Sequence, residues 1–266
     1  MARFTRLLFS FLAFGLTLSL KAQDTTAVHP IELDQEALSG IGLKKIPLKN
    51  EPEREFFQKN LYRGPEISVY VVSSQTWPGQ MDNFGIDEFL YVLNGQAHLR
   101  PEKGDEIHFE AGDYFFAHRG YTGGWETIES KKGYYYELSV ITTQRAPDSV
   151  ELIDKNPFLL DPHTLSEDTP PALSSLPGQE IFVETLAKGV ELSVSVIEEE
   201  PQSRNMANDG EQLIGILAGK LILTATDGTS FTYKTGDWFI LPKGFEGVWE
   251  CEGHGLMRSI HIYKSR

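Results

Sequence analysis

The feature that most constrains the fold of this chain is a long internal repeat. Residues 95–126 align without gaps on residues 219–250, so the same pattern returns 124 positions later. Glycine is favoured where the backbone needs a positive φ or has little space, so shared glycines predict shared turns. Two copies of a long unit indicate a duplicated domain, because a solenoid needs several short repeats. The matched positions are Gly95/Gly219, Gly104/Gly228, Gly112/Gly236, Asp113/Asp237, Phe115/Phe239, Gly120/Gly244, Gly123/Gly247, Trp125/Trp249 and Glu126/Glu250.

Each copy has the pattern of short β-strands. The apolar run at 89–93 ends at an Asn-Gly pair, which is typical of a hairpin. The segment 97–110 alternates apolar and polar residues around a turn, which predicts a half-buried hairpin with His98 and His108 on its polar face. Many short strands between evenly spaced turns favour a sandwich or barrel. We therefore predict an all-β chain.

The repeat also predicts where the domains lie. We expect residues 61–143 to form the first barrel and residues 176–266 the second. The acidic, proline-rich segment 144–175 is expected to be the linker and to contain one short helix. Residues 23–60 are polar, and we expect this extension to pack over a barrel edge or to join the sheet of the first domain. Units of this size are typical of independent domains.

The first 22 residues have the pattern of a signal peptide. Arg3 and Arg6 precede an apolar run at 7–20, which is shorter than the roughly 20 residues that span a bilayer. Cleavage is expected after Ala22, and the mature protein would then be periplasmic or secreted. Loss of three basic residues with this segment, the third being Lys21, would change the net charge from −14 to −17.

Charge and cysteine content exclude some classes of partner and bond. A net charge of −14 argues against nucleic-acid binding and against attachment to an anionic membrane, because both depend on Lys and Arg. We expect no stable membrane insertion after signal cleavage. Cys251 is the only cysteine, so the chain has no internal disulfide, and we expect this side chain to be buried.

The two units resemble the cupin superfamily. The second cupin motif, G-x5-P-x-G-x2-H-x3-N, matches Gly112-x5-His118-x-Gly120-x2-Gly123 and, in the copy, Gly236-x5-Pro242-x-Gly244-x2-Gly247. The first motif ends as Glu88-x6-Gly95 and, in the copy, as Gln212-x6-Gly219. The resemblance implies two tandem double-stranded β-helix, or jelly-roll, barrels.

A narrower resemblance is carried by two longer stretches. D-E-F-x-Y-V-L-x-G at 87–95 and G-D-x-F-x-x-P-x-G-F-x-G-x-W-E at 236–250 resemble the cupin class named after (S)-ureidoglycine aminohydrolase. Many members of that class have no assigned activity, so the resemblance implies a fold and a barrel site without fixing a reaction.

The metal site that the resemblance implies is missing its histidines. Metal-dependent cupins hold the ion with three His and one Glu, ligands that suit Mn, Fe, Ni or Zn. Here the first two histidine positions fall within 81–84 and, in the copy, within 205–208. The third position is Gly123 in one unit and Gly247 in the other. We therefore predict two degenerate metal sites and no metal cofactor.

The residues left at these positions have two interpretations. Trp125 and Trp249 follow the two glycines by two positions and so face the barrel interior, either as core or stacked on a ligand. Glu88 lies on an apolar strand, either as a structural hydrogen-bond partner or in a ligand or residual metal site. A site that combined Glu88 with Asp82 and Asn83 would favour Ca or Mg, because all of its ligands would be oxygen atoms.

Three functions are compatible with this pattern. The leading hypothesis is a metal-free cupin that binds a small polar molecule in the first barrel. One alternative is an aminohydrolase, isomerase or lyase that acts on an ureido or sugar-derived substrate, with Glu88 as a general acid or base whose pKa is raised by burial. Another is a structural or interaction module with filled barrels, and a homodimer is expected by analogy with other cupins. The candidate ligand-binding residues are Tyr70, Trp77, Glu88, Trp125, Gln212 and Trp249.

Overall fold

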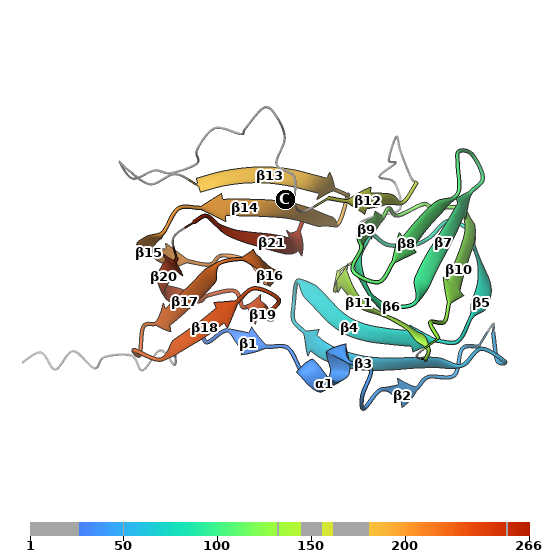
Figure 1. The fold of residues 1–266 in the computed structure, drawn as a ribbon, viewed down its shortest axis with the longest axis horizontal. Helices are drawn as coiled ribbons and strands as arrows, with labels where there is room; N and C mark the ends of the chain where they lie inside the picture. Colours follow the sequence, from blue (N-terminus) through green and yellow to red (C-terminus); the bar gives the residue numbers. More distant parts are fainter. Residues whose placement is uncertain (1–26, 50, 132, 145–155, 162–180, 254) are drawn as a thin grey trace, which may run out of the picture.

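The computed structural model describes residues 27–49, 51–131, 133–144, 156–161, 181–253 and 255–266 (Figure 1). The expected signal peptide and most of the expected linker, with its short helix, lie outside these residues. The one helix described is α1 (Gln35–Leu38), whose first turn is capped by the Asp34 carboxylate accepting from the Ala37 backbone N–H. In this part of the chain, no helix combines the length and the hydropathy that crossing a membrane requires.

The first barrel consists of two antiparallel sheets. The outer sheet has the order β5 (Trp77–Met81), β10 (Gly123–Ile128), β7 (Gln96–Pro101) and β8 (Ile107–Glu110). The inner sheet has the order β12 (Phe158–Leu160), β9 (Tyr114–Ala117), β6 (Glu88–Asn94), β11 (Tyr135–Thr142), β4 (Ile67–Ser74), β3 (Phe56–Arg63) and β2 (Lys44–Lys45).

The second barrel repeats this arrangement. Its outer sheet has the order β15 (Gln202–Ala207), β20 (Glu246–Glu252), β17 (Lys220–Ala225) and β18 (Ser230–Lys234). Its inner sheet has the order β1 (Ile31–Glu32), β19 (Trp238–Leu241), β16 (Gln212–Ala218), β21 (Met257–Lys264), β14 (Leu192–Glu199) and β13 (Ile181–Lys188). The prediction of an all-β chain with two tandem barrels is confirmed.

Two short strands lie outside the simple repeat. In the N-terminal segment, β1 pairs with β19 of the second barrel, with Ile31 opposite Ile240, before the chain continues through α1 into β2 and β3 of the first barrel. The segment expected to be an extension therefore contributes to both barrels. Within the segment expected to be the linker, β12 pairs with β9, with Phe158 opposite Phe116. The edge of the first barrel's inner sheet is thus extended by residues that follow the barrel in the sequence.

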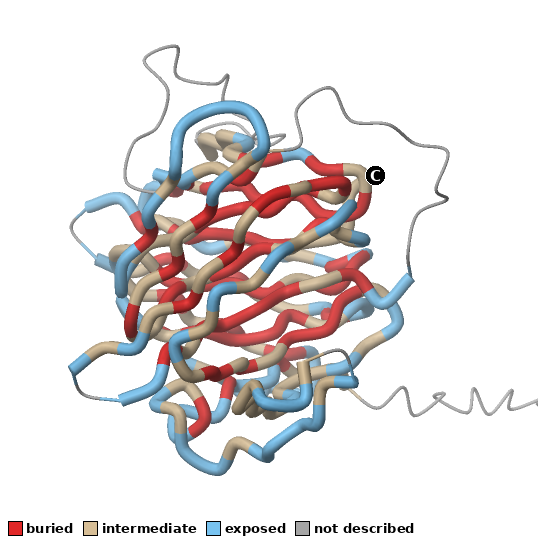
Figure 2. The backbone as a smooth tube through the Cα atoms, turned by 90° about the vertical axis from the view of Figure 1, so that its right-hand side faces the viewer, coloured by how far each residue is buried: buried red, intermediate tan, exposed pale blue. Residues whose placement is uncertain are grey.

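The inner sheets of the two barrels pack face to face. Alternation along the strands sends one set of side chains into each barrel and the other set into this interface. One continuous apolar cluster contains Val69 and Val140 from the first barrel with Val194, Trp238 and Ile262 from the second. Figure 2 shows this buried backbone running through the middle of the molecule between exposed rims. The two barrels therefore share one core in addition to the core inside each barrel.

Reciprocal hydrogen bonds join the barrels at two places. The Glu211 carboxylate accepts from the backbone N–H groups of Glu66 and Ile67 at 2.8 and 3.0 Å, and the Glu211 N–H donates to Glu66 Oε2 at 2.8 Å. At the equivalent place in the duplicated pattern, the Glu191 N–H donates to Asp87 Oδ2 at 2.7 Å, and the Asp87 N–H donates to Glu191 Oε2 at 3.3 Å. These paired exchanges hold the two barrels in one relative orientation.

Candidate functional site

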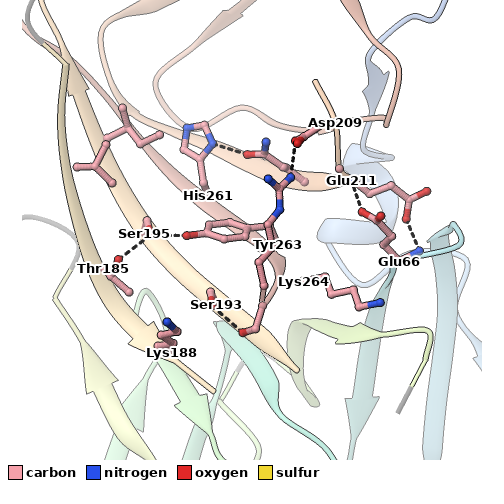
Figure 3. A pocket seen from close by; sticks show the side chains of 16 residues that line it. Glu66, Thr185, Lys188, Ser193, Ser195, Asp209, Glu211, His261, Tyr263 and Lys264 are labelled. Atoms are coloured by element: carbon pink, nitrogen blue, oxygen red, sulfur yellow. Dashed lines mark hydrogen bonds and ion pairs between the residues drawn. The ribbon is translucent and has the colours of Figure 1, made fainter. Parts of the chain in front are cut away.

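A cavity of about 670 Å³ lies in the second barrel, where the barrel meets the first (Figure 3). A volume of this size is in the range of small-molecule sites. Strands β13, β14 and β21 supply most of its wall, and Glu66 comes from the first barrel. The polar lining residues are Glu66, Thr185, Lys188, Ser193, Ser195, Asp209, Glu211, Gln212, His261, Tyr263, Lys264, Ser265 and Arg266.

A chain of hydrogen bonds fixes the side chains of Gln212 and His261 in the cavity wall. The two hydrogens of the Asn208 amide nitrogen are shared among the backbone carbonyls of Gly210, Leu241 and Pro242, and its oxygen accepts from Gln212 Nε2 at 2.9 Å. Gln212 therefore presents its oxygen to His261 Nδ1, also at 2.9 Å. The His261 ring must carry its hydrogen on Nδ1, because an amide oxygen can only accept.

The same network keeps His261 neutral. With Nδ1 donating to Gln212, Nε2 accepts from the Ser259 hydroxyl at 2.8 Å. Burial and, to a smaller extent, the nearby positive charge of Arg204 together lower the pKa of His261 to about 3. At neutral pH the cavity wall therefore contains an uncharged imidazole whose two nitrogen atoms are both hydrogen-bonded.

Trp249 packs behind His261, away from solvent. Its side chain is 1% exposed, and the centroids of the two rings are 6.2 Å apart. Its Nε1 donates to the Cys251 sulfur at 3.2 Å. The Arg204 guanidinium lies 5.2 Å above the Trp249 ring and donates two hydrogen bonds of 3.2 Å to the buried Glu199 carboxylate. Trp249 therefore supports His261 from the barrel core and has no open face for a ligand to stack on.

The acidic side chains of the cavity are already paired. The Glu211 carboxylate accepts from the Tyr62 hydroxyl at 2.6 Å in addition to its backbone donors. Glu66 has Lys243 at 3.3 Å, and Asp209 forms an ion pair with Arg266. Each carboxylate thus has a donor that compensates its charge.

Two lysines of the cavity, in contrast to these carboxylates, have no partner in the described ranges that compensates their charge. Within the part of the chain that the structure describes, Lys188 and Lys264 have no hydrogen-bond or ion-pair partner. Lys188 is opposite Ser193 and Lys264 is opposite Leu192, so the two lysines flank the same end of β14, with their side chains starting on opposite faces of the sheet. Figure 3 shows the two ammonium groups pointing apart. Each unpaired ammonium group makes its own surroundings attractive to an anion.

Between the lysines and His261, the cavity wall is rich in hydroxyl groups. Ser195 Oγ lies 2.9 Å from the Tyr263 hydroxyl oxygen and 3.4 Å from Thr185 Oγ1. Nearer the lysines, Ser193 Oγ lies 2.7 Å from Ser265 Oγ. Hydroxyl groups both donate and accept, so this wall suits a ligand that carries hydroxyl groups of its own.

The first barrel has the equivalent contact with different chemistry. Glu88 takes the position of Gln212, and the strand registers place Ser139 where His261 lies. The Ser139 hydroxyl donates to the Glu88 carboxylate, and the neighbouring Glu137 accepts from the Tyr135 hydroxyl.

The Glu88 and Glu137 carboxyls retain protons above their usual range. Burial raises the pKa of Glu88, although the hydrogen bond from Ser139 opposes the shift. Burial also raises the pKa of Glu137, and the negative charge of Glu88 raises it further. The buried carboxyl of Glu137 and the partly buried carboxyl of Glu88 therefore hold protons in the first barrel, whereas the second barrel holds a neutral imidazole.

The other predicted residues of the first barrel differ in how near they lie to Glu88. Trp125 is 7% exposed and packs against the aromatic rings of Phe84, Phe115 and Tyr121. Tyr70 is opposite Ser139 on the neighbouring strand β4 and is partly buried.

Trp77 lies at the other end of the first barrel. Trp77 is opposite Thr127, and the Thr127 hydroxyl contacts Ser74, which is opposite Tyr135 on β11. Glu88 is opposite Ile141, which also lies on β11. Six strand positions, about 20 Å, separate Tyr135 from Ile141. The structure therefore brings Glu88 together with Ser139 and Glu137, and Trp77 lies too far from Glu88 to share a ligand with it.

The barrel interiors do not fit the metal of the family. A Cβ added at Gly123 would lie 2.4 Å from the Arg100 carbonyl oxygen, and one at Gly247 would lie 2.2 Å from the Thr224 carbonyl oxygen. No side chain can therefore replace either glycine without moving backbone. Among the described residues, three or more potential ligands come together only at His98, Glu106 and His108, on the outer sheet of the first barrel.

Sequence reasoning did not select His261, Lys188 or Lys264. His261 was visible as one polar residue within an alternating strand, but nothing in that strand distinguished it from a core histidine. Its register opposite the Gln212 strand is the signal that identifies it. The two lysines carry no motif, and only the pairing of β13 and β21 with β14 brings them together.

Comparison with known proteins agrees with this architecture. The family model described as EutQ-like cupin domain matches residues 66–135 and 192–257. A protein of unknown function from Pseudomonas syringae pv. tomato str. DC3000 superposes with a TM-score of 0.63 at 18% identity, over 88% of this chain and 98% of its own. A cupin 2 conserved barrel domain protein from Leptotrichia buccalis gives 0.55 at 14% identity, over 91% and 99%.

These solved structures share the fold with this chain, and their low identity carries no activity over to it. No curated protein matches the chain. The narrower resemblance to the (S)-ureidoglycine aminohydrolase class stays a prediction. With both barrels matched by the family model, the chain belongs to the cupin superfamily as a tandem pair of EutQ-like cupin domains.

Proposed function

We propose that this protein is an exported binding protein for a small hydroxylated carboxylate, which it holds in the cavity of the second barrel. The observation that carries the proposal is the pair of unpartnered lysines, Lys188 and Lys264, at one end of a cavity of about 670 Å³. A carboxylate placed beside either ammonium group gains a charge-assisted contact, which is stronger than a contact between neutral groups.

The rest of the cavity supports a ligand with several hydroxyl groups. Ser195 and Tyr263 present hydroxyls to the interior, and Gln212 has a second amide hydrogen beyond the one that it donates to Asn208. The His261 ring is neutral and both of its nitrogen atoms are hydrogen-bonded, so it forms part of the cavity wall without adding charge. An acid with a hydroxylated chain of a few carbons satisfies both ends of such a site.

The proposed site lies in the second barrel, whereas the sequence predicted a site in the first. The sequence favoured the first barrel because Glu88 stands at the family's glutamate position there. The described cavity belongs to the second barrel and includes one of the residues predicted from the sequence, Gln212. Export is supported by the N-terminal sequence, where two arginines precede an apolar run of signal-peptide length.

Binding is tested by thermal unfolding of the untagged protein without residues 1–22. The probes are hydroxy acids from glycolate to gluconate, with neutral polyols of matched length as controls. A ligand at 100 times its dissociation constant stabilises the folded state by about 2.7 kcal/mol, a shift of several degrees in Tm for a chain of this size. The proposal expects at least one acid to raise the Tm while its polyol does not. Failure of the whole panel would contradict it.

A second candidate function is catalysis in the first barrel. The observation that favours it is the raised pKa of the neighbouring Glu88 and Glu137 carboxyls, because a protonated carboxyl near neutral pH can act as a general acid. The substrate would be an ureido or sugar-derived compound, as the resemblance to the aminohydrolase class implies. Glu88→Gln keeps the shape and removes the titrating group. If the Glu88→Gln variant still turned over such a substrate, Glu88 would be excluded as the general acid or base.

A further inference from the structure

Two histidines and a glutamate meet on the outer face of the first barrel. His98 on β7 and His108 on β8 are directly opposite each other, and their rings stack at 3.9 Å with an angle of 14°. The Glu106 carboxylate oxygen Oε1 lies 3.2 Å from His108 Nε2 and 3.7 Å from His98 Nδ1. One potential ligand atom from each side chain therefore lies within 4.8 Å of the other two.

We propose that His98, Glu106 and His108 form a binding site for a divalent transition metal, of which Zn²⁺ is the best match. Two imidazoles and a carboxylate are ligands that zinc prefers, at distances of about 2.0–2.2 Å. A purely oxygen-ligated site would instead favour calcium or magnesium. Three protein ligands leave the remaining coordination position to water or to a group from outside the protein.

The ligand set is specific to one copy of the duplicated unit. The second barrel places Ile222 opposite Thr232 in the same hairpin register, and Ser230 stands where Glu106 does. The equivalent hairpin of the second barrel therefore lacks all three ligands. The cluster lies on the outer face of the first barrel and shares no residue with the second-barrel cavity.

A neighbouring arginine holds the carboxylate beside the histidines. Arg100 Nη2 lies 3.0 Å from Glu106 Oε1 and 2.8 Å from Glu126 Oε2. Glu126 is also directly opposite His98, on strand β10. Arg100 therefore links the two carboxylates that flank the histidine pair, which orients Glu106 as an outer-shell partner orients a metal ligand.

The site is open to solvent and easily altered. The side chain of His108 is 55% exposed and that of Glu106 is 38% exposed. Substitutions at these positions remove ligand atoms without disturbing the barrel core. The chain also offers a matched control in His29, an exposed histidine 2.8 Å from the Asp227 carboxylate but without a second histidine beside it.

The experiment is a calorimetric titration of the untagged, chelator-treated protein with Zn²⁺. We expect one equivalent to bind, and we expect His108→Ala and Glu106→Gln each to weaken binding at least about tenfold. His29→Ala should bind zinc as the wild type does. The absorption spectrum of the Co²⁺-loaded protein should lose its imidazole-dependent features in His98→Ala and in His108→Ala.

Two results would overturn the proposal. One is the absence of a stoichiometric binding event in the wild-type protein. The other is equal zinc affinity in wild type and in a folded His98→Ala/His108→Ala variant, which would place the metal elsewhere. Neither result would bear on ligand binding in the second barrel, because the two sites share no residue.

Discussion

His261 Nδ1 donates a hydrogen bond to Gln212 Oε1 over 2.9 Å, and in the first barrel the equivalent positions are occupied by Ser139 and Glu88, which are also hydrogen-bonded. The duplication therefore kept the contact between two inner strands and changed its chemistry. In the second barrel both partners stay neutral at physiological pH. In the first, the carboxyl of Glu88 can gain or lose a proton in that range.

Replacing His261 by phenylalanine should destabilise the protein. The change takes the imidazole partner away from the buried Ser259 hydroxyl and from the partly buried Gln212 Oε1, and an unsatisfied buried polar group costs about 1–3 kcal/mol. Urea unfolding measures the loss. His29→Phe, at an exposed ion pair, should cost less than about 1 kcal/mol. Equal stability of the His261→Phe variant and the wild type would show that the network contributes nothing.

The low pKa of His261 should make the protein sensitive to acid. The folded-state pKa of about 3 lies below the unfolded value of 6.5, so the unfolded chain takes up the proton first as the pH falls. The contribution of the neutral ring is fully present above pH 6.5 and is lost progressively as the pH falls toward 3. His261→Gln removes this dependence. Between pH 7 and pH 5, its stability relative to wild type should improve by about 2 kcal/mol, and a constant difference would contradict the assignment.

Glu137 should have the opposite dependence on pH. Its folded-state pKa is raised by burial and by Glu88, so its protonated form is favoured in the folded state, and stability is lost as the pH rises through the folded-state value. Glu137→Gln mimics the protonated side chain. The variant should match wild type near pH 5 and exceed it by about 1–3 kcal/mol at pH 9. Glu110→Gln, at an exposed position, is the control and should show no such crossover.

Alanine at Gly64 or Gly189 should weaken the junction between the barrels. A Cβ at Gly64 would lie 2.0 Å from Glu211 Oε1, and one at Gly189 would lie 2.1 Å from Asp87 Oδ2. Either carboxylate must then leave the backbone N–H groups that it holds. We expect each variant to lose about 2 kcal/mol or more in denaturant unfolding. Gly255→Ala, with open space around it, is the matched control, and an equally small effect in all three would disprove the role of the junction.

The sequence predicts the strands of this protein much better than its site. The shared glycines and the Asn-Gly turn at the end of β6 are local signals, so they predict the duplication and the barrel strands. The pairing of β1 with β19 joins residues about 200 positions apart and leaves no local trace.

For a similar reason, the sequence could not predict which of the two barrels contains the cavity. Trp125 and Trp249 occupy matching positions in the sequence, and both are buried in their barrel cores. What distinguishes the barrels is the arrangement of Lys188, Lys264 and His261, which come from the two strands on either side of β14. Such a cluster depends on strand register and on the length of side chains at strand ends, and no periodicity in the sequence encodes either one.

The measurement that tests the central claim most directly compares the binding of hydroxy acids by wild type and by Lys188→Met/Lys264→Met. Isothermal titration is carried out at low and at moderate salt, with the exposed Lys234→Met as the control. The proposal predicts that an acid which binds wild type loses at least about tenfold in affinity in the double variant, that Lys234→Met retains the affinity, and that salt weakens binding. Unchanged affinity in the folded double variant, or equal binding of the neutral polyol, would contradict a carboxylate site in the second barrel.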